Sequence, residues 1–234
     1  MQLVGLEAIK AEYIQHCGSD LMAVKAARVS TGRETVEFGD KEHKLVKYLA
    51  EHGHFTPFEM IDATFLVDCP IFIARQYHRH RTFSYNEWSG RYSVVGESFF
   101  VPGLLKKQDT MNKQGSVGEF TDKENNENIS IIEYQCMKAF ESYDKLLSNG
   151  VSKELARMVL PQNMMTKFYA KANLRNWMHY CSLRCDAHAQ SEHQHLANQI
   201  FHELLKMFPI SVGALAKAMF NDDTLNKLGI SKEQ

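Results

Sequence analysis

The chain has 234 residues and a formal net charge of -1; hydrophobic residues make up 44% and charged residues 24%. This composition is ordinary for one globular domain with a buried core, and the near-zero charge excludes a generally basic nucleic-acid binder or a protein drawn to an acidic membrane surface. No apolar run reaches the roughly 20 residues that span a bilayer, and Met1–Glu7 lacks a basic leader, so we expect neither membrane helix nor signal peptide.

The first part of the chain predicts short helices around one strand. Apolar residues at helical spacing favour helices at 7–16, 20–29 and 40–51, followed by a turn at 56–59. From Ile61 to Cys69 apolar residues alternate with mostly polar ones, which predicts a strand. Pro70 ends that strand and fits the first turn of a helix over about 71–81.

The second part of the chain is mostly helical by the same criteria. Residues 106–128 are polar and predict a surface excursion or mobile insertion. Helices are expected at 129–148, 152–159, 166–181 and 187–208. The pattern indicates an α+β fold: a modest, mainly antiparallel sheet surrounded by helices, with a helical C-terminal half, in a single domain spanning 1–234.

The five cysteines form an odd set without a CxxC pair: Cys17, Cys69, Cys136, Cys181 and Cys185. This set indicates reduced thiols in a cytoplasmic protein. Cys69 is expected to be buried on the inner face of the strand, where free cysteines are usually inert. Cys181 and Cys185 flank Arg184 and stay open as reactive groups.

Positive charge is concentrated between Arg75 and Tyr92, where Glu87 is the single acid. The basic residues are Arg75, His78, Arg79, His80, Arg81 and Arg91. Arginine makes two-pronged hydrogen bonds to phosphate, and the interleaved aromatic rings suit a flat heterocycle. A single-stranded nucleic-acid groove would use the same residues. Because the basic residues do not continue as a stripe, a compact nucleotide site is favoured.

The histidines offer a third interpretation, a metal hydrolase. The candidates are His78, His80, His188, His193 and His195. Glu192 lies beside His193, but the spacing matches no HExxH pattern, so no metal site is expected. His193 and His195 are expected on an exposed helical face.

Fourteen residues of this segment resemble the signature of flavin-dependent thymidylate synthases. The matching run is Arg79-His80-Arg81-x-x-Ser84-x-Asn86-Glu87-x-Ser89-x-Arg91-Tyr92. So many fixed positions make the match specific. Further similarity lies in His54-x-x-Pro57-Phe58-Glu59, Glu154-Leu155-Ala156-Arg157-x-x-Leu160-Pro161, Asn173-Leu174-Arg175 and Leu183-Arg184-x-x-x-His188-Ala189-Gln190.

The resemblance implies an enzyme that makes dTMP from dUMP. In this family 5,10-methylenetetrahydrofolate is the carbon donor and NADPH-reduced FAD the hydride donor, without a cysteine nucleophile. It also implies a homotetramer with sites at subunit interfaces. No nucleic acid or membrane partner is expected. Ser89 is another conceivable nucleophile, but no base is evident beside it in the sequence.

The resemblance also assigns the site residues. On the cofactor side it implies His54, Thr56, Arg79, His80, Arg81, Glu87, Asn173, Leu174, Arg175 and His179. On the substrate side it implies Gln76, Arg79, Glu87, Trp88, Ser89, Gly90, Arg91, Arg157 and Arg184. Arg184 is the implied catalytic residue, because a fixed guanidinium at the uracil edge stabilises the negative charge that develops there. His188 and Gln190 follow it and support it, unless His188 caps or pairs within a helical core.

Three residues depart from the family pattern. Met60 stands where the upstream loop often has a histidine, and His179 stands where an asparagine is common. Trp88 is bulkier than the aliphatic residue expected there, and either stacks on a ligand or packs.

Overall fold

The computed structural model describes residues 1–32, 34–91, 96–111 and 115–231, so Tyr92 of the signature lies outside the described residues. Contacts divide the chain into two compact units, and each unit is built from three segments. Unit 1 comprises Met1–Lys10, Asp68–Arg79 and Asn86–Phe168; unit 2 comprises Ala11–Val67, His80–Tyr85 and Tyr169–Gln234. The signature therefore contributes residues to both units.

The main sheet has four strands in the order β2-β3-β8-β4 and is mainly antiparallel. The strands are β2 (Lys10–Cys17), β3 (Asp62–Pro70), β8 (Met165–Asn173) and β4 (Ser84–Glu87). The predicted α+β class is confirmed, and so is the strand predicted from Ile61 to Cys69. Its alternation gives the expected face, because Ala63, Phe65, Val67 and Cys69 are all buried.

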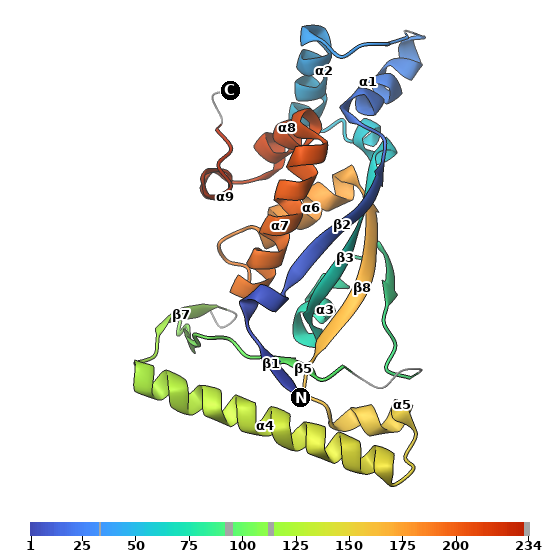
Figure 1. Ribbon diagram of the computed structural model, residues 1–234. Coiled ribbons are helices and arrows are strands. Elements are labelled where there is room, and N and C mark those ends of the chain that lie inside the picture. Colours follow the sequence, from blue (N-terminus) through green and yellow to red (C-terminus); the bar gives the residue numbers. More distant parts are fainter. Residues whose placement is uncertain (33, 92–95, 112–114, 232–234) are drawn as a thin grey trace. The chain divides into compact units, whose positions relative to one another are not determined.

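Unit 2 holds most of the helices (Figure 1). They are α1 (Asp20–Arg28), η2 (Val29–Thr31), α2 (Asp40–Glu51), η3 (Thr56–Met60), α6 (Leu174–Arg184), α7 (Ser191–Met207), α8 (Pro209–Met219) and α9 (Asp222–Lys227). Trp177 of α6 is fully buried, donates from Nε1 to the carbonyl oxygen of Ala63 at 3.0 Å, and packs edge-on against Phe65 at 5.1 Å. This contact fixes α6 on the inner face of β3.

The start of α8 is tied to the start of α1. The Asp20 carboxylate accepts hydrogen bonds from the backbone nitrogens of Ile210 and Ser211, at 3.1 and 2.8 Å. Backbone N–H groups in the first turn of a helix have no acceptor inside that helix, and the carboxylate supplies one to each. Its negative charge also interacts favourably with the positive end of the helix dipole. Unit 2 is thereby closed between two segments that are 190 residues apart.

Unit 1 packs around the long helix α4 (Asp122–Ser148). Its other elements are β1 (Gln2–Val4), η1 (Leu6–Ala8), α3 (Ile71–Tyr77), β5 (Ser98–Phe100), β6 (Lys106–Gln108), β7 (Ser116–Glu119), α5 (Lys153–Ala156) and η4 (Arg157–Val159). β1 pairs in parallel with β5, and β6 pairs antiparallel with β7. Phe99, Cys136, Tyr143, Ala156 and Met164 form the buried cluster of this unit.

Two expected helices are strands. Residues 10–17 form β2 instead of a helix over 7–16, and Tyr13 packs edge-on against Phe65 of β3 at 6.2 Å. Residues 165–173 form β8 instead of the start of a helix over 166–181. Thr166, Phe168, Ala170 and Ala172 are buried at a period of two, a signal that the few apolar residues at helical spacing had concealed.

Other boundaries also differ from the expectation. The helix expected over 71–81 ends at Tyr77. α4 begins at Asp122, inside the expected polar excursion, because Thr121 and Glu124 form a capping box that starts the helix there. The helix expected over 187–208 begins at Ser191, and α8 and α9 were not predicted. Within the described ranges no helix is long and apolar enough to cross a membrane.

Candidate active site

Arg184 lies at the end of α6 and is held by a histidine of the signature. Its Nε donates to Nε2 of His80 at 3.1 Å. The Tyr85 hydroxyl donates to the carbonyl oxygen of His80 at 2.9 Å, and Nδ2 of Asn176 donates to the carbonyl oxygen of Thr82 at 3.3 Å. The turn from His80 to Tyr85 is thereby fixed to itself and to α6.

Two buried histidines surround this arginine. The ring of Tyr180 lies 5.0 Å from the ring of His80 and 5.6 Å from that of His193. Burial first, then the charge of Arg184, lower the pKa of His80 to about 4 and that of His193 to about 3. Both rings are therefore neutral at pH 7. The prediction that His193 and His195 lie on an exposed face is wrong. His193 shares the buried face of α7 with Leu196, Ala197 and Ile200, and His195 is half-buried.

The other end of α6 carries a second group of predicted residues. Asn173 caps the helix by accepting from the backbone nitrogen of Asn176 at 3.0 Å. Arg175 forms an ion pair with Glu59 of η3, and its guanidinium carbon lies 5.7 Å above the ring of Phe55. Leu174 is fully buried and packs in the core, and its assignment to the cofactor stays a prediction.

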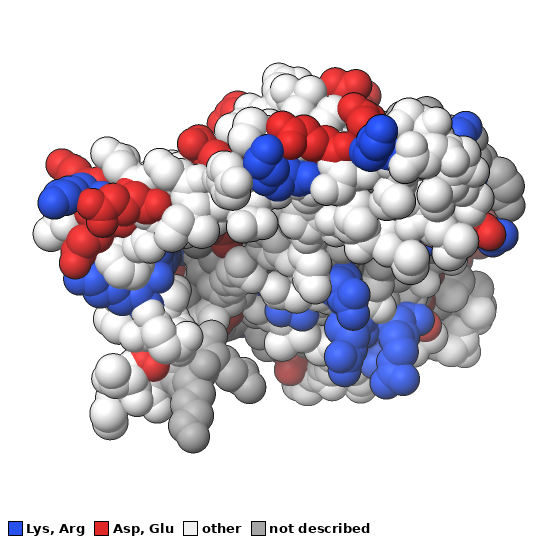
Figure 2. Space-filling model, turned by 90° about the horizontal axis from the view of Figure 1, so that it is seen from below, with Lys and Arg blue, Asp and Glu red and all other residues white. Residues whose placement is uncertain are grey.

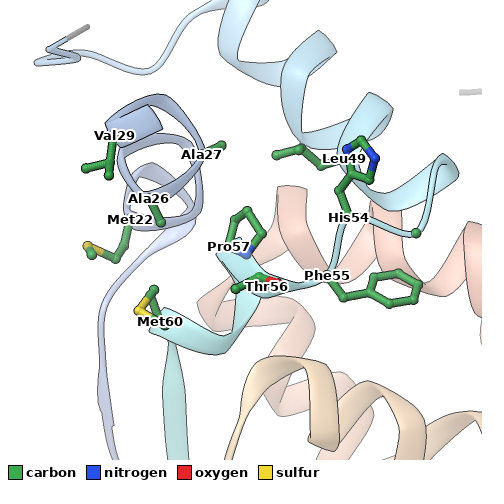
Figure 3. A pocket seen from close by; sticks show the side chains of 11 residues that line it. Met22, Ala26, Ala27, Val29, Leu49, His54, Phe55, Thr56, Pro57 and Met60 are labelled. Carbon is green, nitrogen blue, oxygen red and sulfur yellow. The ribbon is translucent and has the colours of Figure 1, made fainter. Parts of the chain in front are cut away.

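An apolar pocket of about 660 Å³ lies in unit 2, next to this group. Figure 3 shows the side chains that line it. α1 and η2 contribute Met22, Ala26 and Val29 to its lining, and the chain from α2 to η3 contributes Leu49, His54, Thr56, Pro57 and Met60. The volume is within the range of small-molecule and cofactor sites. Of the predicted flavin-side residues, His54 and Thr56 are in its lining.

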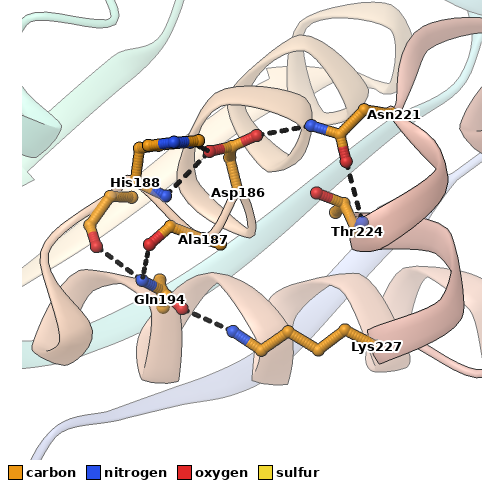
Figure 4. Close-up of polar contacts among 8 residues, drawn as sticks. Asp186, Ala187, His188, Gln194, Asn221, Thr224 and Lys227 are labelled. Atoms are coloured by element: carbon orange, nitrogen blue, oxygen red, sulfur yellow. Dashed lines mark hydrogen bonds and ion pairs between the residues drawn. The ribbon is translucent and has the colours of Figure 1, made fainter.

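Hydrogen bonds of Asp186 hold the loop that follows Arg184 (Figure 4). The Asp186 carboxylate accepts from the backbone nitrogen and Nδ1 of His188, both at 2.8 Å, and from Nδ2 of Asn221 at 2.6 Å. His188 is exposed, lies in a turn and pairs with Asp186, so this pair lies outside a helical core. Its predicted support of Arg184 stays a prediction.

Unit 1 contains a separate hollow formed by the second half of the signature. Its volume is about 320 Å³, and its lining consists of Ile71, Glu87, Trp88, Ser89, Gly90, Arg91, Arg157, Leu160, Met164 and Thr166. Six of the nine predicted substrate-side residues thus lie together. The other three are Gln76 and Arg79, at the end of α3 in unit 1, and Arg184 in unit 2.

Two hydrogen bonds and one ion pair fix polar side chains of this hollow. Thr166 donates to Glu87 at 2.7 Å, and Arg91 forms an ion pair with Glu154 at 3.3 Å. Arg157 donates from Nε to the carbonyl oxygen of Glu154 at 3.3 Å, so both arginines are organised around one residue. A phosphate would compete with Glu154 for Arg91.

The charged side chains on the surface are grouped locally, as expected for a chain of net charge -1. On the face shown in Figure 2, some Lys and Arg side chains lie among Asp and Glu, whereas another group of basic side chains lies apart from the larger acidic groups. Arg79 and Arg81, the two arginines of the Arg-His-Arg run, are both exposed.

The family model described as thymidylate synthase complementing protein matches residues 12–210. A Kosmotoga olearia protein named flavin-dependent thymidylate synthase is 38% identical over 229 residues, covering 98% of this chain and 99% of the relative. A Thermotoga neapolitana protein of the same name is 38% identical over 228 residues, covering 97% and 100%. The chain belongs to the flavin-dependent thymidylate synthase family.

Solved structures give the same result. UMP/dUMP methylase PolB from Streptomyces cacaoi, bound with 5-Br dUMP, has a TM-score of 0.84 and 35% identity to this chain, and covers 92% of this chain and 97% of its own. The structure of PolB bound with 5-Br UMP gives the same TM-score and identity and covers 94% and 97%. The family assignment also removes the metal hydrolase, and no cluster of potential metal ligands occurs in the part of the chain that is described.

Within this thymidylate synthase, the structure adds residues that the sequence had not indicated. Thr166 holds Glu87, Glu154 holds Arg91, and Glu59 holds Arg175. Glu59 and Glu154 are part of the motifs that resemble the family, but no role was assigned to them. The alternating pattern of residues 166–172 was the signal that could have indicated Thr166. The departures Met60 and His179 are both exposed, and Met60 lines the apolar pocket. Trp88, also exposed, lines the hollow of unit 1, which favours a ligand contact over core packing.

Proposed function

We propose that this thymidylate synthase converts dUMP to dTMP, with 5,10-methylenetetrahydrofolate as carbon donor, FAD as cofactor and NADPH as reductant. The observation that carries the proposal is the match to the family along nearly the whole chain, to relatives that bear this name. The structural neighbour bound with 5-Br dUMP supports dUMP as the substrate.

The hollow of unit 1 supplies the nucleotide-binding residues. We assign Arg91 and Arg157 to the phosphate, because both residues line this hollow and arginine makes two-pronged bonds to phosphate. Ser89 and Gly90 form its backbone turn, in which Oγ of Ser89 accepts from the backbone nitrogen of Arg91 at 3.3 Å. We assign Gln76 and Arg79 to the same substrate, with Glu87 and Trp88 beside it.

The residues of unit 2 fit a flavin. The pocket between α1, α2 and η3 is apolar, which suits a flat ring system, and Arg175 and the exposed Arg81 suit a pyrophosphate. We assign His54, Thr56, Asn173, Arg175 and His179 to cofactor binding, with Arg79, Arg81 and Glu87 contributed by the signature. When bound, the flavin supplies the hydride.

Arg184 stabilises negative charge on the uracil. No carboxylate among the described residues forms an ion pair with it, so its full charge is available to the ligand. Half-burial lowers its pKa but leaves the guanidinium protonated, and a cation in a partly dry site acts more strongly than one in water.

The cysteines do not take part in this mechanism. Cys69, Cys136, Cys181 and Cys185 are buried, as expected for Cys69, and burial raises the pKa of Cys69, Cys136 and Cys181. A thiol nucleophile needs the opposite, a lowered pKa and access to the substrate. Cys17 is exposed on β2.

We also propose a cytoplasmic homotetramer whose sites are completed at subunit interfaces.

The purified wild-type protein tests the function. We expect a flavin absorbance spectrum that bleaches with NADPH in the presence of dUMP, and dTMP formation that requires the folate. A protein that cannot be reconstituted with FAD, or that makes no dTMP when loaded, contradicts the proposal. UMP run in parallel tests a second candidate substrate, because the structural neighbour is named a UMP/dUMP methylase.

Replacement of all five cysteines by serine or alanine tests the absence of a thiol nucleophile. We expect dTMP formation to stay within about 10-fold of wild type in the folded, flavin-loaded variant. The substitutions change packing and the hydrogen bond from Nδ2 of Asn163 to Sγ of Cys136, but no side chain assigned to a ligand. Turnover that disappears while flavin content and circular dichroism are preserved would show that a cysteine is required.

A further inference from the structure

The resemblance placed His80 among the residues that contact the flavin. The structure gives its side chain a different neighbour. Nε2 of His80 accepts from Nε of Arg184 at 3.1 Å, although 104 residues separate the two along the chain. His80 is 8% exposed, so little of it is presented to a ligand.

The bond engages the guanidinium at one nitrogen only. Arginine has five N–H donors in a planar fork, and Nε carries one of them. A bond at Nε fixes the plane of the fork and leaves the four donors of the terminal nitrogens directed away from the stem. This is the arrangement required for planar recognition of a uracil edge.

We propose that His80 is a positioning residue, whose ring orients the Arg184 guanidinium toward the substrate. The proposal rests on the function proposed above, in which Arg184 contacts the uracil. An acid in place of His80 would orient the arginine equally well, but its negative charge would offset the positive charge that the reaction uses. A neutral acceptor orients the arginine and preserves that charge.

The surroundings of His80 keep its ring neutral. Arg184 faces it from the end of α6, His179 and Tyr180 face it from the same helix, His193 belongs to α7, and Tyr85 binds its carbonyl oxygen. Burial, then Arg184, then His179 lower the pKa of His80 to about 4. As the pH falls from 6.5 toward 4, this ring contributes progressively less to folding, since the unfolded chain binds the proton first.

Replacement of the ring tests the proposal through kinetics. We expect His80→Leu to bind FAD as wild type does, while kcat for dUMP falls about 10-fold, the effect of one lost hydrogen bond to a charged group. His80→Gln keeps an acceptor oxygen at similar reach and should recover most of that loss. In the Arg184→Lys background, His80→Leu should have almost no further effect, because the two residues act as one unit.

A matched control is His78→Leu. His78 is half-buried two residues earlier and packs edge-on against Phe168 at 4.9 Å. Its loss should combine additively with Arg184→Lys, because the ring contact of His78 is with Phe168 of β8. Additive losses for His80→Leu and Arg184→Lys, or loss of FAD from His80→Leu, would overturn the positioning role.

A spectroscopic measurement keeps this test separate from the proposed function. In the wild-type protein, nitrogen shifts of His80 should show an unprotonated Nε2 that does not titrate between pH 8 and 6. Arg184→Met should raise the pKa of His80, because a neighbouring cation is removed. An unchanged His80 pKa in that variant contradicts the contact, whatever dTMP assay results are obtained. Absence of dTMP in wild type, with this contact intact, refutes the function alone.

Discussion

Arg184→Lys should lower kcat about 100-fold or more while FAD stays bound. Loss of one preorganised donor at a developing anion typically costs about 100- to 1000-fold in kcat. Lysine keeps the charge but has no planar fork and no Nε–H to donate to His80. The guanidinium would therefore be replaced by an ammonium whose direction is not fixed. Single-turnover oxidation of the reduced flavin by dUMP and folate measures the step directly.

The distribution of the loss between kcat and KM identifies the role of Arg184. If Arg184 acts mainly on charge that develops during the reaction, kcat and kcat/KM fall together and KM for dUMP changes little. A variant with normal kcat and raised KM would show that Arg184 only binds. Lys227→Met serves as the control, because this substitution removes one positive charge from the same unit. Lys227 donates a hydrogen bond to Gln194 of α7.

Arg157→Ala should raise KM for dUMP about 10- to 100-fold, with a much smaller change in kcat. Arg157 lines the hollow of unit 1, and one charge-assisted hydrogen bond to phosphate accounts for a change of this size. The binding is remote from the pyrimidine, so ground state and transition state should be affected alike. With deoxyuridine, which lacks the phosphate, wild type and Arg157→Ala should have nearly the same kcat/KM.

Two further variants sharpen the experiment. Glu154→Gln releases Arg91 from its ion pair at 3.3 Å and should lower KM for dUMP, because the phosphate no longer competes with a carboxylate. Lys145→Ala removes an exposed positive charge from the same unit and should leave KM unchanged apart from screening. An equal rise in KM for Lys145→Ala and Arg157→Ala would show that only the general charge of the unit matters.

The sequence predicted those parts of the site that are local in the chain. Residues 87–91 are contiguous, so their shared hollow follows from one turn. The bond from His80 to Arg184 could not be predicted, because it depends on how α6 packs against β3 through Trp177. The resemblance also grouped His80 with Arg79 and Arg81 on the cofactor side, whereas His80 is neutral by burial and its two neighbours are exposed.

The errors in the fold have a common cause. Strands β2 and β8 were both predicted as helical, from a few apolar residues at helical spacing. In β8 the decisive signal was strict alternation from Thr166 to Ala172, and its small or polar members weakened the pattern. In β2 six successive residues are exposed, so burial left no periodic mark, and only pairing with β3 makes it a strand.

Helix α6 begins at Leu174 and ends at Arg184. At about 1.5 Å per residue it is roughly 16 Å long, with Asn173 and Arg175 at one end and Arg184 at the other. Its length is therefore a functional quantity. Insertion or deletion of a single residue would turn Arg184 by about 100° around the axis and separate it from His80, even if every side chain were retained. Homologues can vary those surface positions of this helix that contact no ligand, but its residue count should be invariant.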